Sequence, residues 1–182
     1  RELLQLPDIK SASLTFDLPN DVPFGRIIIY PPKHADASSQ LNLPVATADE
    51  DYAKTFGIEM KAGSFFANNK TGFVINETTA KQLGLTATEA IGKKIETAAN
   101  TSITITGVMH DYHFSSLQDK IGPVGFVHIS NSNTYKYLIV KLAGNNINHS
   151  IEAIKAKWKS FLPNAPFDYT FMDEKFAALY KT

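Results

Sequence analysis

Hydrophobic and polar residues alternate along several short stretches of this chain, which is the pattern of half-buried β-strands. Residues 11–16 alternate in this way and place Ala12, Leu14 and Phe16 on one face. The same alternation, or a short apolar run, predicts further strands at residues 26–30, 41–48, 73–75, 93–97, 102–108, 124–129 and 137–142. Proline and glycine punctuate the chain between many of these stretches. The pattern therefore predicts a fold rich in β-sheet.

Helices are predicted from capping residues and from apolar residues that recur at three- and four-residue steps. The longest helix follows Asn146 or Asn148, since either residue can cap it. Its apolar stripe consists of Ile147, Ile151, Ile154, Trp158 and Phe161. Shorter helices are predicted at residues 2–6, 77–83 and 86–91 and, after a capping Asp173, at the C-terminal end. Another short helix is opened by Asp49-Glu50-Asp51, carries Tyr52 and Phe56, and is closed by Gly57. Thr86 and Glu89 have the spacing of a capping box.

The order of elements near the C-terminal end predicts a βαβ unit. The strand at residues 137–142 leads into the long helix, which Pro163 and Pro166 end. Residues 167–172 then alternate between aromatic and polar positions like a second strand. Two strands joined through a helix lie parallel in one sheet. With the strand pair predicted at 93–97 and 102–108, the fold class is α+β.

Composition excludes several classes of protein. The 182 residues are 43% apolar and 20% charged, with a net charge of zero, as in an ordinary globular domain. Only Arg1 and Arg26 are arginine, the residue that best binds phosphate and guanine, so no nucleic-acid partner is expected. The absence of cysteine excludes disulfides and thiolate zinc sites, and it suits a bacterial extracytoplasmic protein. The aliphatic run at residues 27–30 is far shorter than the ~20 residues that span a bilayer.

One group of residues could hold a metal ion. His110, Asp111 and His113 offer imidazole and carboxylate ligands suited to zinc, and they would serve a metal-dependent hydrolase. However, a continuing strand would turn the two histidines to opposite faces, which favours a polar strand end instead. Nucleotide-binding loops, serine elbows and zinc-binding helix motifs do not occur in the sequence. We therefore predict a domain that is not an enzyme, with no catalytic, cofactor-binding or metal-binding residues and no cofactor.

Other residues that often carry chemistry have structural explanations here. Asp49-Glu50-Asp51 and Asp173-Glu174 precede or open predicted helices, where the helix dipole stabilises negative charge. The first group also lacks the spacing and the central glycine of a calcium-binding EF-hand. Trp158 lies on the apolar stripe of its helix and is expected to be a core residue rather than a ligand platform.

Several short motifs follow one another in order along the chain. The segment from Tyr52 to Phe66, with Ser64 where arginine is usual, resembles the "fgi…l..GR.F" stretch of the MacB/FtsX-type ABC transporter permeases. Further similar segments follow in the family's order at Phe73–Lys81, Ala90–Ile95, Gly107–Leu117, Ile121–Pro123 and Pro166–Glu174, with Leu179-Tyr180 at the end. The ordered set covers most of the chain and is more specific than any one motif.

The resemblance implies a domain between the first and second transmembrane helices of a permease, on the periplasmic face of the bacterial inner membrane. It implies two lobes. A porter-like α/β lobe would comprise residues 1–66 and 135–182, and an inserted β-rich Sabre-like lobe would comprise residues 67–134. Apolar segments of ~20 residues are then expected on both sides of the chain in the parent protein.

The resemblance also implies partners. These are the domain's own transmembrane helices, a second permease copy or half, and a cytoplasmic ABC ATPase reached through the permease. ATP-driven movement would then act on a periplasmic protein, peptide or lipoprotein, which requires stiff lobes whose orientation can switch. Two alternatives stay open: a free-standing periplasmic binding or adaptor module, and the metal-dependent hydrolase built on His110, Asp111 and His113.

Overall fold

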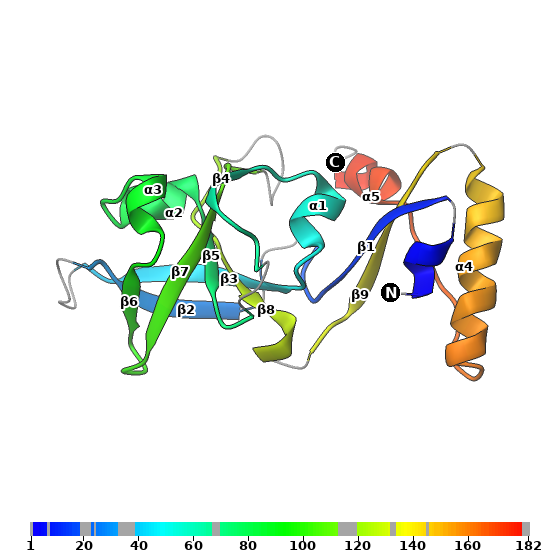
Figure 1. Ribbon diagram of the computed structural model, residues 1–182, viewed down its shortest axis with the longest axis horizontal. Helices are drawn as coiled ribbons and strands as arrows, with labels where there is room; N and C mark the ends of the chain where they lie inside the picture. Colours follow the sequence, from blue (N-terminus) through cyan, green and yellow to red (C-terminus); the bar gives the residue numbers. More distant parts are fainter. Residues whose placement is uncertain are drawn as a thin grey trace. The chain divides into compact units, whose positions relative to one another are not determined.

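The computed structural model describes residues 2–6, 8–18, 23, 25–32, 39–66, 70–112, 120–131, 134–144 and 146–179, with side chains up to residue 175 in the last range (Figure 1). Predictions made for His113 and Tyr180 lie outside the described residues. Mixed strands and helices are present throughout, as the α+β prediction requires.

Contacts divide the chain into two compact units. The terminal unit consists of Arg1–Ala12 and Val140–Thr182, and the inserted unit consists of Ser13–Ile139. The predicted lobes likewise join the two chain ends, but their boundaries differ from these, and the lobe at residues 67–134 stays a prediction. Strands β1 (Ile9–Thr15) and β9 (Tyr137–Leu142) are neighbours, and each passes from one unit into the other.

Six strands of the inserted unit pair in a closed ring. In order around the ring, they are β2 (Gly25–Tyr30), β6 (Lys94–Thr97), β7 (Ser102–Met109), β5 (Phe73–Asn76), β8 (Gly125–His128) and β3 (Leu41–Ala48). Strand β2 closes the ring because it pairs antiparallel with both β3 and β6. The β5–β7 and β3–β8 pairs are parallel, and the other pairs are antiparallel. Strand β4 (Met60–Gly63) adds to β7 outside the ring.

Short helices accompany these strands where capping residues predicted them. They are α1 (Tyr52–Phe56), α2 (Glu77–Gln82) and α3 (Ala87–Ala90), and a 3-10 turn, η2, follows β8 at Ile129–Asn131. Gly57 ends α1 in the left-handed conformation, with φ of 72°, which glycine adopts without strain. The capping box of α3 is confirmed, because Thr86 and Glu89 each accept a backbone N–H of the other.

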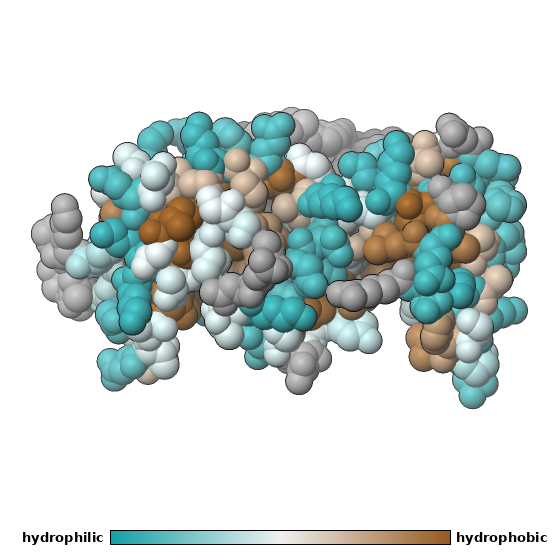
Figure 2. Space-filling model, in the orientation of Figure 1, coloured by the Kyte–Doolittle hydropathy of each residue, from teal (hydrophilic) through white to brown (hydrophobic). Residues whose placement is uncertain are grey.

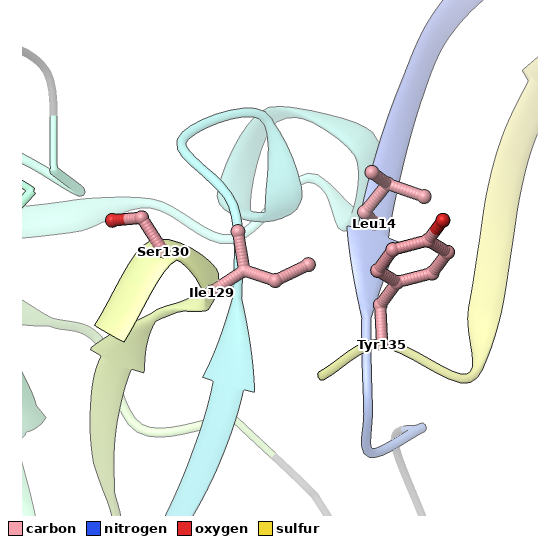
Figure 3. Close-up of a pocket in the computed structure, with 4 residues that line it drawn as sticks. All are labelled: Leu14, Ile129, Ser130 and Tyr135. Carbon is pink, nitrogen blue, oxygen red and sulfur yellow. The ribbon is translucent and has the colours of Figure 1, made fainter. Parts of the chain in front are cut away.

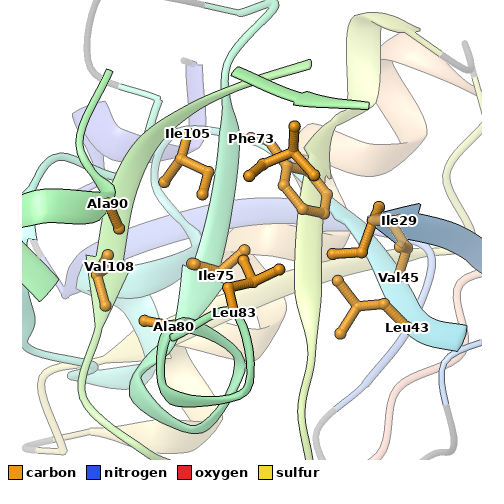
Figure 4. Packing of buried hydrophobic residues seen from close by; sticks show 11 residues of the cluster. Ile29, Leu43, Val45, Phe73, Ile75, Ala80, Leu83, Ala90, Ile105 and Val108 are labelled. Carbon is orange, nitrogen blue, oxygen red and sulfur yellow. The ribbon is translucent and has the colours of Figure 1, made fainter. Parts of the chain in front are cut away.

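Two apolar clusters occupy opposite faces of the ring strands. The first gathers Ile29, Leu43, Phe73, Ile75 and neighbouring aliphatic residues from the strands and from α2 and α3 (Figure 4). The second contains Val74, which follows Phe73 directly, because successive strand residues point to opposite faces. Its centre is aromatic, and the Tyr52 ring lies 5.4 Å from that of Phe126 and 4.7 Å from that of Phe56. The inserted unit therefore has a substantial core.

The terminal unit contains η1 (Glu2–Gln5), α4 (Ile147–Phe161) and α5 (Met172–Leu179). Asn146 caps α4 by accepting the His149 N–H, which settles the choice left open with Asn148. Trp158, predicted as core, is only half-buried, and its indole N–H donates to the Ala165 carbonyl at 3.3 Å. None of the helices among the described residues has the length and apolar character to cross a bilayer.

The second strand predicted for the βαβ unit does not form. Residues 167–171 have no ladder partner, and α5 begins at Met172. Alternate aromatic side chains contact one another instead, with centroid separations of 5.9 Å for the tilted pair Phe167–Tyr169 and 5.6 Å for the edge-to-face pair Tyr169–Phe171. Alternation of aromatic and polar residues is compatible both with a strand and with this row of aromatic rings. The alternation alone therefore could not establish a strand. Asp173 correspondingly lies inside the first turn of α5 rather than at its cap.

Candidate functional site

A small apolar pocket lies in the inserted unit where β1 ends and β9 is about to begin. Figure 3 shows Leu14 beside the ring of Tyr135, with Ile129 reaching toward them from η2, while the Ser130 hydroxyl points away. The cavity is about 230 Å³, below the roughly 300–1,000 Å³ of typical small-molecule sites. It can take one apolar side chain or a group of similar size. Tyr135 is 62% exposed, so the pocket is open to the surface.

The backbone beside this pocket is held by Asp49. The Asp49 carboxylate accepts the Ser13 hydroxyl at 2.7 Å and the Leu14 N–H at 2.6 Å. It also accepts the Asp51 N–H at 3.2 Å. Burial raises the pKa of Asp49, although these three hydrogen bonds act in the opposite direction. Asp49 therefore connects the end of β3 to β1 and does not cap α1.

The next residue, Glu50, is hydrogen-bonded to a buried histidine. The Glu50 carboxylate lies 2.9 Å from Nε2 of His128, whose side chain is almost fully buried. The Ser130 N–H donates to Nδ1 of the same ring at 3.1 Å, which makes Nδ1 an acceptor and leaves Nε2 to donate to Glu50. The hydrogen bond from His128 lowers the pKa of Glu50. This chain of contacts connects η2, which forms one wall of the pocket, to the turn that precedes α1.

These findings correct the explanation predicted for Asp49-Glu50-Asp51. Asp51 occupies the N-cap position of α1 but its side chain makes no capping hydrogen bond. The carboxylates of Asp49 and Glu50 instead bind groups 35 and 78 positions away in the sequence, Leu14 and His128. Proximity to a helix start had suggested a local role, and no local pattern identifies these distant partners.

His110 and Asp111 bind the N-terminal end of α2. Nδ1 of His110 lies 3.0 Å from Oε2 of Glu77. Asp111 accepts both the backbone N–H and the hydroxyl of Thr78, at 3.0 and 2.8 Å. Burial raises the pKa of Glu77, but the hydrogen bonds from Asp111 and His110 and the nearby charges of His110 and Lys61 lower it overall. His113 lies outside the described residues, and within the described parts of the chain no three His, Asp or Glu side chains are placed to share a metal ion.

Asn76 is a buried polar hub that the sequence did not single out. Its Oδ1 accepts the Thr79 N–H at 3.0 Å and the Val124 N–H at 3.2 Å, while its amide donates to the Gly122 carbonyl at 2.9 Å. Asn76 thus caps α2 and fixes the segment before β8 in one set of contacts. Asparagine directly before the predicted helix at residues 77–83 was a signal for the cap, but no local pattern indicates the contacts with Gly122 and Val124.

Comparisons with known proteins identify the fold and the family. The periplasmic region of MacB from Actinobacillus actinomycetemcomitans aligns with a TM-score of 0.64 and 14% identity, over 100% of this chain and 80% of that one. A domain of a putative permease protein from Porphyromonas gingivalis aligns with a TM-score of 0.61 and 17% identity, over 96% and 83%. The extracellular domain of the noncanonic ABC-type transporter YknZ from Gram-positive bacteria aligns with a TM-score of 0.57 and 12% identity, over 88% and 80%.

No curated protein sequence matches the chain. The family model of the MacB-like periplasmic core domain, in contrast, matches residues 7–157, which is most of its length. The match confirms the resemblance inferred from the ordered motifs. The chain belongs to the family of MacB-like periplasmic core domains and is an extracytoplasmic domain of an ABC transporter permease.

Proposed function

We propose that this domain couples ATP hydrolysis in the cytoplasm to a conformational change outside the bacterial inner membrane. The observation that carries the proposal is the division of the chain into two compact units. The chain passes between them only after Ala12 and after Ile139, within β1 and β9. Two units connected in this way can change orientation as bodies, as mechanical transmission requires.

The distribution of the core supports this proposal. Among the described residues, the buried hydrophobic side chains lie in the inserted unit except for Ile9 and Ile154. A well-packed unit resists deformation, so that a displacement at its connections moves it as a whole. The proposal takes the inserted unit, Ser13–Ile139, as the moving arm, and the lobes expected at residues 1–66 with 135–182 and at 67–134 stay a prediction with other boundaries.

We infer the partners from the same family membership. The domain would be connected to its own transmembrane helices, act beside a second permease copy or half, and receive movement from a cytoplasmic ABC ATPase. Its arm would push or release a periplasmic protein, peptide or lipoprotein. The ATPase carries out the chemistry in this scheme, and the domain itself contributes no catalytic or cofactor-binding residue.

Distance measurements in the full-length permease, assembled with its ATPase in lipid, would test the proposal. The domain contains no cysteine, so Glu96→Cys on β6 and Glu152→Cys on α4 place one spin label on each unit. We expect the distance distribution between them to differ between the nucleotide-free state and an ATP-bound, hydrolysis-deficient state. Double electron–electron resonance measures this distribution directly.

A matched pair within the inserted unit provides the control. Lys81→Cys and Glu96→Cys are both exposed and both belong to that unit, so their separation should stay constant in every nucleotide state. If transport proceeds while the Glu96–Glu152 distribution also stays constant, the proposed coupling through unit movement is wrong.

A further inference from the structure

The boundary between the two units falls inside a single strand. Ile9 to Ala12 of β1 belong to the terminal unit, whereas Ser13 to Thr15 belong to the inserted unit. Because β1 is continuous across the boundary, the two units can change their relative orientation there only if one unit holds its part of the strand firmly. The contacts of Ser13 to Thr15 show how the inserted unit holds its part of the strand.

Asp49 makes the first contacts past the boundary. Its Oδ1 accepts the Ser13 hydroxyl at 2.7 Å and its Oδ2 accepts the Leu14 N–H at 2.6 Å. The Asp49 N–H donates in return to the Leu14 carbonyl at 3.0 Å. One residue thus binds both residues that follow the boundary, through side chain and backbone together. Hydrogen bonds to a charged acceptor are roughly twice as strong as neutral ones.

The residues after Leu14 are bound to the same end of β3. The Thr15 hydroxyl donates to the Thr47 carbonyl at 2.8 Å, and the Phe16 N–H donates to the same carbonyl at 3.0 Å. The Lys136 N–H donates to the Thr15 carbonyl at 3.0 Å, which fixes the segment leading into β9 as well. On the inserted-unit side, the end of β1 is therefore hydrogen-bonded both to the end of β3 and to the segment that leads into β9.

The carboxylate of Asp49 is costly to keep at this position. Burial raises its pKa despite three hydrogen bonds, so the charged form is less favourable there than in water. Asp51, two residues later, is a matched acid whose side chain does not cap α1. A half-buried acid whose carboxylate binds the first two residues after the boundary, Ser13 and Leu14, is placed to position β1.

We propose that Asp49 is the positioning residue at which the inserted unit grips β1, so that reorientation occurs on the terminal side of Ser13. This inference rests on the proposed function for its consequence in transport, but the grip itself is a property of the 182-residue chain. Removing the carboxylate should loosen the orientation of the units without unfolding either. Loss of the grip would leave Leu14 with an unpaired N–H at the unit boundary.

The test compares Asp49→Ala, Asp49→Asn and Asp51→Ala in the purified chain. Hydrogen exchange at the Leu14 amide should become about tenfold faster or more in Asp49→Ala, because that amide loses a charged acceptor. The Glu96–Glu152 spin-label distribution should broaden in the same variant. Asp49→Asn keeps one acceptor oxygen and should give an intermediate result, while Asp51→Ala should behave like the wild type.

Several outcomes would overturn the inference. The inference is wrong if Asp49→Ala gives the same Leu14 exchange rate and the same Glu96–Glu152 distance distribution as Asp51→Ala. It is also wrong if Asp49→Ala changes the exchange rate but not that distribution. Broadening of the Lys81–Glu96 control pair would also count against it, because Asp49 would then support the inserted unit generally. If the inter-unit distribution broadens but a full-length Asp49→Ala permease transports normally, the grip is correct and the proposed coupling is wrong.

Discussion

At the scale of single residues, two neighbouring carboxylates show how environment sets the behaviour of an acid. Burial raises the pKa of Asp49, whereas the hydrogen bond from His128 lowers the pKa of Glu50. The two residues are adjacent in the sequence, yet their contributions to stability change with pH in opposite directions. Only the partners that the fold provides distinguish them.

Replacing Glu50 by glutamine should change the acid dependence of stability. Because the folded state lowers the pKa of Glu50, its ionised form stabilises the protein above the ordinary glutamate pKa of 4.5, and this contribution disappears as pH falls through the folded-state value. Glu50→Gln should therefore lower the free energy of unfolding near pH 6 and converge with the wild type in strong acid. Urea unfolding at a series of pH values measures both.

Glu96→Gln is the matched control for this experiment. Glu96 lies exposed on β6, and its replacement also removes one negative charge from the inserted unit. Its pH profile should follow that of the wild type. Parallel profiles for Glu50→Gln and Glu96→Gln would contradict the role assigned to the His128 contact.

Sequence reasoning could find the residues of the candidate site only in part. His110 and Asp111 were recognised as a polar group at a strand end, which is where they lie, but their binding to Glu77 and Thr78 was not predicted. Asp49 was given a local explanation. Such hydrogen bonds join residues more than thirty positions apart, and a side chain's distant partner depends on strand order, which hydrophobic periodicity does not contain.

At the scale of elements, close backbone approach controls how β4 and β7 meet. Gly63 and Gly107 are opposite each other in the pair, and the ladder shifts register nearby, between Met60 and Ala62. A Cβ placed on Gly107 would lie 2.3 Å from the Ser64 carbonyl oxygen, and backbone cannot rotate away as a side chain can. Glycine is therefore required at this crossing.

Gly107→Ala should destabilise the inserted unit by roughly 1–3 kcal/mol, the usual cost of overpacking. Gly122→Ala offers the control, because a Cβ there would meet no atom within 4 Å. Thermal or urea unfolding distinguishes the two variants. Equal stability for both would show that β4 can shift away from β7 without cost.

The elements also show which sequence patterns suffice. Alternation and capping residues located β3 at Leu41–Ala48, β9 at Tyr137–Leu142 and the capping box of α3 correctly, because their signals are local. The strand predicted at residues 167–172 was wrong, since a strand also needs an available ladder partner. Closure of the ring by β2 could not be foreseen, because pairing with both β3 and β6 is a property of the whole sheet.

At the scale of the whole molecule, stability is expected to differ between the units. The terminal unit has few buried apolar side chains among its described residues, and α4 buries only Ser150 and Ile154 fully. Units with little apolar burial open at lower free energy than well-packed ones. The terminal unit should therefore open while the inserted unit stays folded.

Native-state hydrogen exchange measures this difference. Amides of α4 should exchange through openings of lower free energy than amides of β5 and β7. A fragment of residues 13–139 should correspondingly keep the slow exchange of β5 and β7 when expressed alone. If α4, β5 and β7 share one opening free energy, the chain unfolds as a single cooperative body and the division has no energetic counterpart.

The hydrogen bond between Lys136 and Thr15 has a consequence for the gene. It brings the start and the end of the inserted unit together, so the segment leaves and re-enters the rest of the chain at one place. The DNA that encodes residues 13–139 can then change in length, or be exchanged as one piece, without changing where the segment joins the rest of the chain.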